Sequence, residues 1–175
     1  PLRLAERAGK IRPFYVMELL ERAKRMEAGG RHIIHMEVGE PDFPTPRLIK
    51  ERAIGAIGDN RTYYTHSLGL PELREAIALH YRTTTGVDVS PDRIIITNGT
   101  SGAFLLLFSV LLESGASVAL ADPGYPCYRN FAELFSANIM ALGVRPEHRY
   151  EVRIDDLENL STLPDLVVFA NPANP

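Results

Sequence analysis

The hydrophobic residues follow two alternating patterns over the second half of the chain. Short runs rich in Val, Ile and Leu are typical of buried strands. They occupy residues 93–97, 117–121, 138–144 and 165–170. Between them, apolar residues recur at helical spacing or in longer runs, at residues 103–112, 128–135 and 154–160. Strands that alternate with helices predict an α/β fold with a mainly parallel sheet and helices on both faces.

The first half of the chain shows helical spacing without this alternation. Residues 1–12 are polar and predict an arm. Helices are expected at residues 13–28, 46–58 and 71–85. Glycine marks the end of each helix, at positions 29–30, 58 and 86. The second of these helices is expected to bury one apolar side, formed by Leu48, Ile49, Ile54 and Ile57. We therefore divide the chain into an N-terminal arm and small-domain element, residues 1–45, and the first part of a larger domain, residues 46–175.

Composition excludes several classes of function. The net charge is −3 and no run of Lys or Arg occurs, which argues against a nucleic-acid partner. The longest apolar run, residues 103–112, is about half of what a membrane span needs, so no membrane association is expected. His32 and His35 lack a third ligand, so no metal is expected. The single cysteine, Cys127, excludes an internal disulfide and favours a cytoplasmic protein.

Three loops rich in Gly, Pro and Asn follow predicted strands. They are residues 98–102, 122–126 and 171–175. In parallel sheets, ligands bind beyond the carboxyl ends of the strands. The sequence therefore predicts that these loops meet at one site.

Each of these loops offers a different chemistry to a ligand. Backbone N–H groups and the hydroxyls of Thr100 and Ser101 suit an anion, although either residue could simply cap the following helix. Tyr125 could stack on a planar ligand or pack on its own helix. Asn171 and Asn174 could donate to a ligand oxygen or only shape a turn. Together, the three loops describe a site for a phosphorylated aromatic cofactor.

Five segments in the same order resemble the N-terminal half of the class I/II, or fold-type I, aminotransferases, which use pyridoxal 5′-phosphate (PLP). They are residues 38–43 (VGEPDF), 64–74 (YTHSLGLPELR), 97–102 (TNGTSG), 122–126 (DPGYP) and 171–175 (NPANP). The resemblance implies transfer of an amino group between an α-amino acid and a 2-oxo acid. It also implies that the chain is truncated and that its sheet is incomplete.

The resemblance assigns cofactor contacts to matching positions. Gly99, Thr100 and Ser101 match the turn that holds the cofactor phosphate. Tyr125 matches the aromatic residue that stacks on the pyridine ring, and Asn174 matches the asparagine that binds its phenolic oxygen. We therefore expect these five residues to contact the cofactor.

Two further positions match residues of the family's substrate and subunit contacts. Gly39 matches a loop beside the substrate carboxylate. Tyr64 matches a tyrosine that reaches the phosphate of the neighbouring subunit, which implies a homodimer with shared active sites; a packed loop tyrosine is the alternative.

No catalytic residue is expected within this chain. The lysines Lys10, Lys24 and Lys50 do not match the family's Schiff-base position, which the resemblance places after residue 175. Three alternatives remain open at this point. The parent protein could be another fold-type I PLP enzyme, such as a carbon–sulfur lyase, decarboxylase or synthase. It could also be a non-catalytic aminotransferase-like ligand sensor, or an α/β domain that binds a nucleotide diphosphate at residues 98–102.

Overall fold

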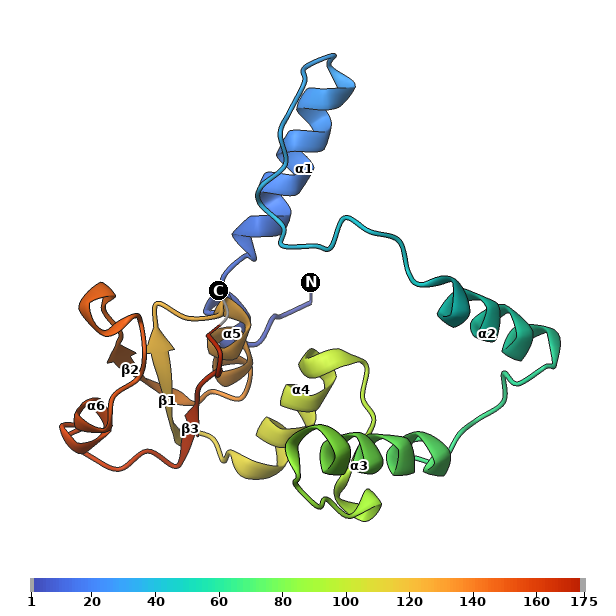
Figure 1. Ribbon diagram of the computed structural model, residues 1–175. Helices are drawn as coiled ribbons and strands as arrows, with labels where there is room; N and C mark the ends of the chain where they lie inside the picture. Colours follow the sequence, from blue (N-terminus) through green and yellow to red (C-terminus); the bar gives the residue numbers. More distant parts are fainter. Residues whose placement is uncertain (1, 174–175) are drawn as a thin grey trace. The chain divides into compact units, whose positions relative to one another are not determined.

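The computed structural model describes residues 2–173, which fall into two compact units (Figure 1). The first unit contains the residues up to Glu37 and those from Gly99 onward, and the second contains Val38–Asn98. We describe each unit by itself.

The first unit is built on a three-stranded parallel sheet. Its strands are β1 (Ser117–Asp122), β2 (Asn138–Gly143) and β3 (Leu166–Val168). They are arranged in the order β2-β1-β3, with Val118 of β1 opposite both Ile139 and Leu166. The predicted α/β class with parallel strands is confirmed for three of the four apolar runs.

Helices connect these strands and cover them. They are α1 (Tyr15–Ala28), α4 (Gly99–Leu111), α5 (Pro126–Leu134) and α6 (Ile154–Glu158), with short 3₁₀ turns η1 (Glu6–Gly9) and η3 (Pro146–His148). The chain passes from β1 through α5 to β2, and then back through α6 to β3 on the other side of β1. Because such crossovers are right-handed, connections that run in opposite directions place their helices on opposite faces of the sheet.

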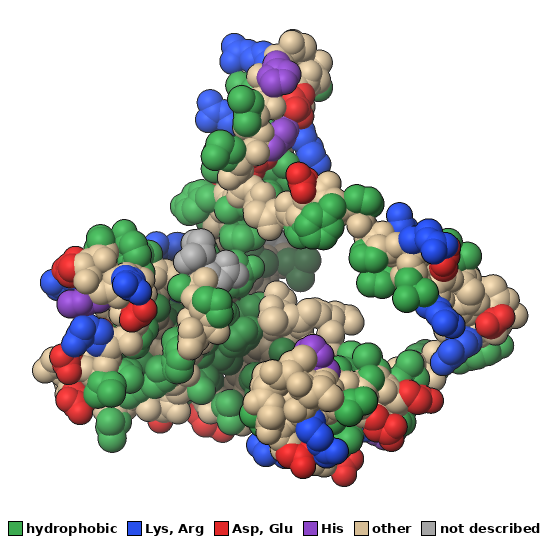
Figure 2. Space-filling model, in the orientation of Figure 1, with side chains coloured by type: hydrophobic (Ala, Val, Ile, Leu, Met, Phe, Trp, Pro, Cys, Tyr) green, Lys and Arg blue, Asp and Glu red, His purple; other side chains and the backbone are tan. Residues whose placement is uncertain are grey.

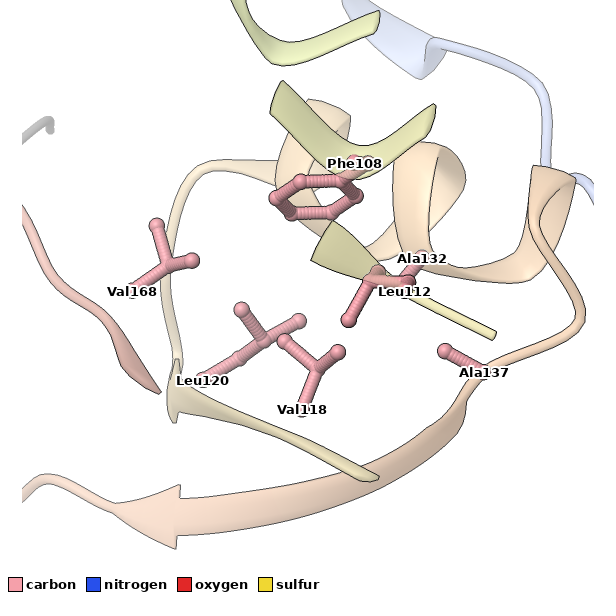
Figure 3. Close-up of a cluster of buried hydrophobic side chains, with 7 residues drawn as sticks. All are labelled: Phe108, Leu112, Val118, Leu120, Ala132, Ala137 and Val168. Carbon is pink, nitrogen blue, oxygen red and sulfur yellow. The ribbon is translucent and has the colours of Figure 1, made fainter. Parts of the chain in front are cut away.

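One buried cluster joins α4 and α5 to the sheet. Figure 3 shows Phe108 and Leu112 of α4 beside Val118 and Leu120 of β1, with Ala132, Ala137 and Val168 completing the cluster. Ala119 lies between Val118 and Leu120 on the opposite face and is also fully buried. Central strand β1 is therefore covered on both faces, as its unbroken apolar run predicts.

The second unit contains α2 (Arg47–Gly58), α3 (Pro71–Thr85) and the 3₁₀ turn η2 (Pro91–Arg93). Its single buried charged side chain among the described residues is Arg74 of α3. Arg74 Nε donates to the carbonyl oxygens of Pro91, at 2.9 Å, and Ile94, at 3.1 Å. Its Nη2 donates to Asp92 Oδ1 at 3.1 Å, so this one side chain joins α3 to η2 and to the residues that follow.

Two sequence predictions about burial are wrong for the described chain. The apolar side of α2 is exposed, and Figure 2 shows hydrophobic side chains at its surface. The apolar run at residues 103–112 predicts a buried helix, but Phe108 is the one fully buried residue of α4, and Val110 is 78% exposed. An apolar pattern indicates which surface of a helix can be buried. That surface is buried only where another part of the protein packs against it.

The predicted strand at residues 93–97 is also not a strand in the described chain. The backbone is extended at Ile94, but none of the described strands pairs with it and Ile95 is 57% exposed. A strand needs hydrogen bonds from a neighbour. Instead, the Ile96 N–H donates to the carbonyl oxygen of Leu68 at 3.0 Å.

Candidate functional site

The first turn of α4 lies at the end of the sheet where the strands finish. Leu112, just after α4, packs in one cluster with Val118 near the start of β1, whereas Phe104 in the second turn of α4 packs on Tyr128 of α5, the helix that follows β1. The first turn of α4 is therefore directed toward the carboxyl end of β1. Gly99 begins this helix with a φ of +69°, and Thr100 and Ser101 follow with exposed side chains. No acidic residue occurs in the first turn. A helix N-terminus without a nearby carboxylate favours an anion, because its dipole and its N–H groups carry positive charge.

A tight turn after β1 places the candidate stacking ring. The bond between Asp122 and Pro123 is cis, and Gly124 packs directly against the carbonyl oxygen of Ala121. A Cβ at Gly124 would overlap that oxygen, so only glycine fits here. The turn leads to Tyr125, which is the N-cap residue of α5.

The ring of Tyr125 is held between two other aromatic rings. Phe14, just before α1, lies 6.2 Å away between ring centroids, at an interplanar angle of 85°. Tyr128, on the first turn of α5, lies 5.4 Å away at 73°. A hydrogen bond with the Cys127 thiol, together with partial burial, raises the pKa of the Tyr125 hydroxyl. A tyrosine is uncharged at neutral pH, and the raised pKa keeps Tyr125 in this state. Its ring contacts its own helix through Tyr128, and its stacking on a planar ligand stays a prediction.

Further aromatic contacts join Tyr125 to α4. The centroid of the Tyr128 ring lies 4.9 Å from that of Phe104. Phe104 also stacks on Phe131 of α5, at 6.0 Å and 13°. Since Phe104 lies one helical turn after Ser101, the rings of Phe104 and Tyr128 connect the first turn of α4 to Tyr125. The two helices that follow the first and second predicted loops, α4 and α5, thus pack on each other, and the meeting of the loops at one site stays a prediction.

The third loop follows β3. The bond between Asn171 and Pro172 is cis, and Asn171 is exposed. Asn174, the residue expected to bind the phenolic oxygen of the cofactor, lies outside the described residues. Its role stays a prediction.

Gly39 and Tyr64 both belong to the second unit. No heavy atom lies within 4 Å of the position where a Cβ would be on Gly39. The side chain of Tyr64 is fully exposed. Its predicted contact with a second subunit stays a prediction.

Comparison with known proteins decides the family. Residues 31–175 match the sequence family described as aminotransferase class I and II. The chain belongs to this family. It is 38% identical over 174 residues to a valine–pyruvate aminotransferase of Mycobacterium tuberculosis, covering 99% of this chain and 44% of that protein. It is 36% identical over 173 residues to an aspartate aminotransferase of Pyrococcus horikoshii, covering 98% of this chain and 43% of that protein.

A solved structure carries the same fold. The chain superposes on an aminotransferase from Mycobacterium tuberculosis with a TM-score of 0.95 and 36% identity, covering 100% of this chain and 45% of the other. The chain therefore spans less than half the length of the class I and II aminotransferases that it matches. The predicted resemblance and the fold class are confirmed.

The lysines of this aminotransferase chain belong to other segments than the candidate site's loops. Lys10 follows η1, Lys24 is in α1 and Lys50 is in α2, and all three are exposed. Within residues 2–173, no group of three or more His, Cys, Asp or Glu side chains is arranged to hold a metal ion. No helix in this part of the chain has the length and hydropathy that a membrane crossing requires.

Sequence reasoning missed two residues beside the site. Phe14 was not recognised as a neighbour of Tyr125, because nothing in the sequence around it indicates which ring it contacts. Asn130 lies in the middle of α5 and pairs with the backbone of Arg12. Asparagine is a poor residue for a helix interior, and this was the signal that could have drawn attention to it.

Proposed function

We propose that the protein containing this chain is a PLP-dependent aminotransferase that moves an amino group between an α-amino acid and a 2-oxo acid. The observation that carries this proposal is the packed connection from the first turn of α4 to Tyr125 through Phe104 and Tyr128. This connection supports the proposal, because it joins a helix whose N-terminus suits an anion to an aromatic ring that follows strand β1. Membership of the aminotransferase family supports the reaction.

The residues of the first unit fit the chemistry of the cofactor. In the proposal, the N–H groups of the first α4 turn and the hydroxyls of Thr100 and Ser101 bind the phosphate, and Gly99 starts the helix without a side chain in the way. The uncharged ring of Tyr125 lies against the pyridine ring and excludes water from it. Asn174 binds the phenolic oxygen. When bound, the cofactor supplies an electron sink for breaking bonds at the α-carbon of an amino acid.

The remaining expected contacts form part of the same proposal. Gly39 leaves open space that a substrate carboxylate can approach, and the exposed Tyr64 ring is available to a second subunit's phosphate site. The protein is accordingly proposed to act as a homodimer with shared active sites. Its single cysteine within this chain suits the reducing cytoplasm.

The test is a titration of PLP into the full-length protein, followed by the absorbance of the bound cofactor. The double variant Thr100→Val/Ser101→Ala should raise the dissociation constant of PLP about tenfold or more, because it removes two hydrogen-bond donors to a charged group. Ser109→Ala is the matched control on the same helix, since the Ser109 hydroxyl donates to the carbonyl oxygen of Leu106 at 2.7 Å. It should leave the dissociation constant within about twofold. A wild-type protein without PLP binding would overturn the proposal.

A second measurement separates transamination from other PLP reactions. Adding an α-amino acid should change the cofactor spectrum, and adding a 2-oxo acid should restore it, because an aminotransferase stores the amino group on its cofactor between two half-reactions. A lyase or decarboxylase would instead release a product without this reversal. The related proteins are named for valine–pyruvate and for aspartate, so valine, alanine and aspartate are the first amino acids to compare.

A further inference from the structure

We propose that Asn130 is a positioning residue that fixes the N-terminal arm so that Phe14 supports the ring of Tyr125. The inference rests on the proposed function, because it gives Tyr125 a cofactor to orient. It goes beyond that function by assigning a role to a residue and to a segment that the cofactor contacts do not include.

The contact between Asn130 and the arm has two hydrogen bonds. The backbone N–H of Arg12 donates to Asn130 Oδ1 at 3.2 Å, and Asn130 Nδ2 donates to the carbonyl oxygen of Arg12 at 3.0 Å. A side-chain amide thereby pairs with a backbone residue that lies 118 positions away. The side-chain amide offers a donor and an acceptor on two neighbouring atoms, as this pairing needs, whereas an ionised carboxylate cannot donate and an apolar side chain can do neither.

This contact is coupled to Tyr125 by a short connection. Pro13 alone separates Arg12 from Phe14, and its ring fixes one backbone dihedral of the link. The Phe14 ring then meets Tyr125 nearly at right angles, at 6.2 Å and 85°. The 3₁₀ turn η1 also contacts α5, so the arm packs on the helix that carries Asn130 at a second place.

Tyr125 is consequently supported from two sides. Tyr128 belongs to the same helix and stays in place whatever the arm does. Phe14 belongs to the arm, and it stays in place only while the arm is attached to α5. Without Phe14, the Tyr125 ring keeps one aromatic neighbour and can change its orientation. A ring that stacks on a planar ligand has to present its face in a fixed direction, so the arm contributes to cofactor binding without touching the cofactor.

The test combines two readouts on the full-length protein. Amide hydrogen exchange of residues 11–17 reports the arm in the absence of PLP, and a PLP titration reports the cofactor site. Asn130→Ala should speed exchange of the Arg12 amide about tenfold and raise the dissociation constant of PLP about three- to tenfold, as loss of one or two neutral hydrogen bonds predicts. Asn130→Asp keeps the size of the side chain and serves if the alanine variant does not fold. It should change both readouts in the same direction.

A matched control and a second variant make the result specific. Asn138 also donates from its amide to a backbone oxygen, that of Gly115 at 2.7 Å, but away from the arm. Asn138→Ala should change neither readout. Phe14→Ala should raise the dissociation constant of PLP as much as Asn130→Ala does, and the double variant should be no worse than either single one, because both act through one contact.

The outcomes separate this inference from the proposed function. Faster arm exchange with unchanged PLP affinity would overturn the positioning role and leave the aminotransferase proposal intact. Unchanged arm exchange in Asn130→Ala would also overturn it. Failure of the wild-type protein to bind PLP would remove the proposed function and this role together.

Discussion

Phe104 of α4 and Tyr128 of α5 lie with their ring centroids 4.9 Å apart and their planes at 52°. At this pair, the helix whose first turn is proposed to bind the cofactor phosphate meets the helix that begins after Tyr125. Phe104 also contacts Phe108 at 5.7 Å and Phe131 at 6.0 Å. The relative position of the two helices therefore depends on one residue with three aromatic neighbours.

Replacing Phe104 should reduce stability without removing the apolar core. Phe104→Leu keeps a hydrophobic side chain but loses three ring contacts, so we expect the free energy of unfolding to fall by about 1–3 kcal/mol. Phe135→Leu is the control, since Phe135 has one ring contact, with Phe108 at 6.5 Å. Its cost should be nearer to about 1 kcal/mol. Chemical denaturation of the full-length protein measures both, and equal costs would contradict the central place of Phe104.

Arg74 should contribute more to stability than a surface arginine of the same helix. Arg74→Met leaves two partly buried carbonyl oxygens without their donor, so a loss of about 1–3 kcal/mol is expected. Arg82 pairs with Asp88 at 2.6 Å, but both side chains are well exposed. Arg82→Met should cost less than about 1 kcal/mol. The denaturation midpoints of the two variants measure both losses of stability. A similar loss in both would show that the hydrogen bonds of Arg74 contribute no more stability than the exposed ion pair of Arg82.

Gly69 should not accept a side chain. Its φ is +100°, and a Cβ would overlap the side chain of Ile96. Gly69→Ala is therefore expected to destabilise the protein by about 1–3 kcal/mol through strain and overlap. Gly55 of α2 has open space around its Cβ position, so Gly55→Ala should stabilise the helix by up to about 1 kcal/mol. Thermal unfolding of both variants tests this prediction, which is a lower melting temperature for Gly69→Ala and a higher one for Gly55→Ala.

His35 makes the segment after α1 sensitive to pH. Its Nδ1 lies 2.6 Å from Glu37 Oε1, and its Nε2 lies 2.9 Å from Glu27 Oε1. The hydrogen bond with Glu37, and then the one with Glu27, raises the pKa of His35 above its ordinary value of 6.5. The hydrogen bond with His35 lowers the pKa of Glu37.

The two shifts define the pH range of this contact. A raised histidine pKa contributes stability that is complete below the ordinary value and is lost as the pH rises through the raised one. A lowered carboxyl pKa contributes stability above its ordinary value, and this is lost as the pH falls through the lowered one. The contact should thus be strongest between the two shifted values. NMR titration of His35 should show its pKa falling in Glu37→Gln, whereas Glu18→Gln, at the start of α1, should leave it unchanged.

The sequence predicted best where a pattern depends only on its own neighbours. The run at residues 117–121 predicted a buried strand, and the structure has it as β1 at the centre of the described sheet. Glycine at position 124 agrees with the tight turn that places Tyr125. These features follow from local sterics and from the preference of an unbroken apolar run for burial.

Prediction failed where a feature depends on a distant group. The run at residues 93–97 has strand composition, but none of the described strands offers it hydrogen bonds. The burial of Arg74 was not predicted, because two of its partners are backbone carbonyl oxygens, which no side chain identifies in a sequence. The pairing of Asn130 with Arg12 was missed for the same reason, because its acceptor and donor on the arm are backbone atoms.

The central position of β1 also predicts where relatives of this chain can differ in loop length. The turn after β1 is enclosed by its own contacts, since Gly124 packs on Ala121 and Tyr125 lies between two rings. The connection from β2 to α6, residues 144–153, follows an outer strand and is mostly exposed. Insertions and deletions that accumulate over evolution should therefore collect in residues 144–153, while the turn at 122–126 keeps its five residues.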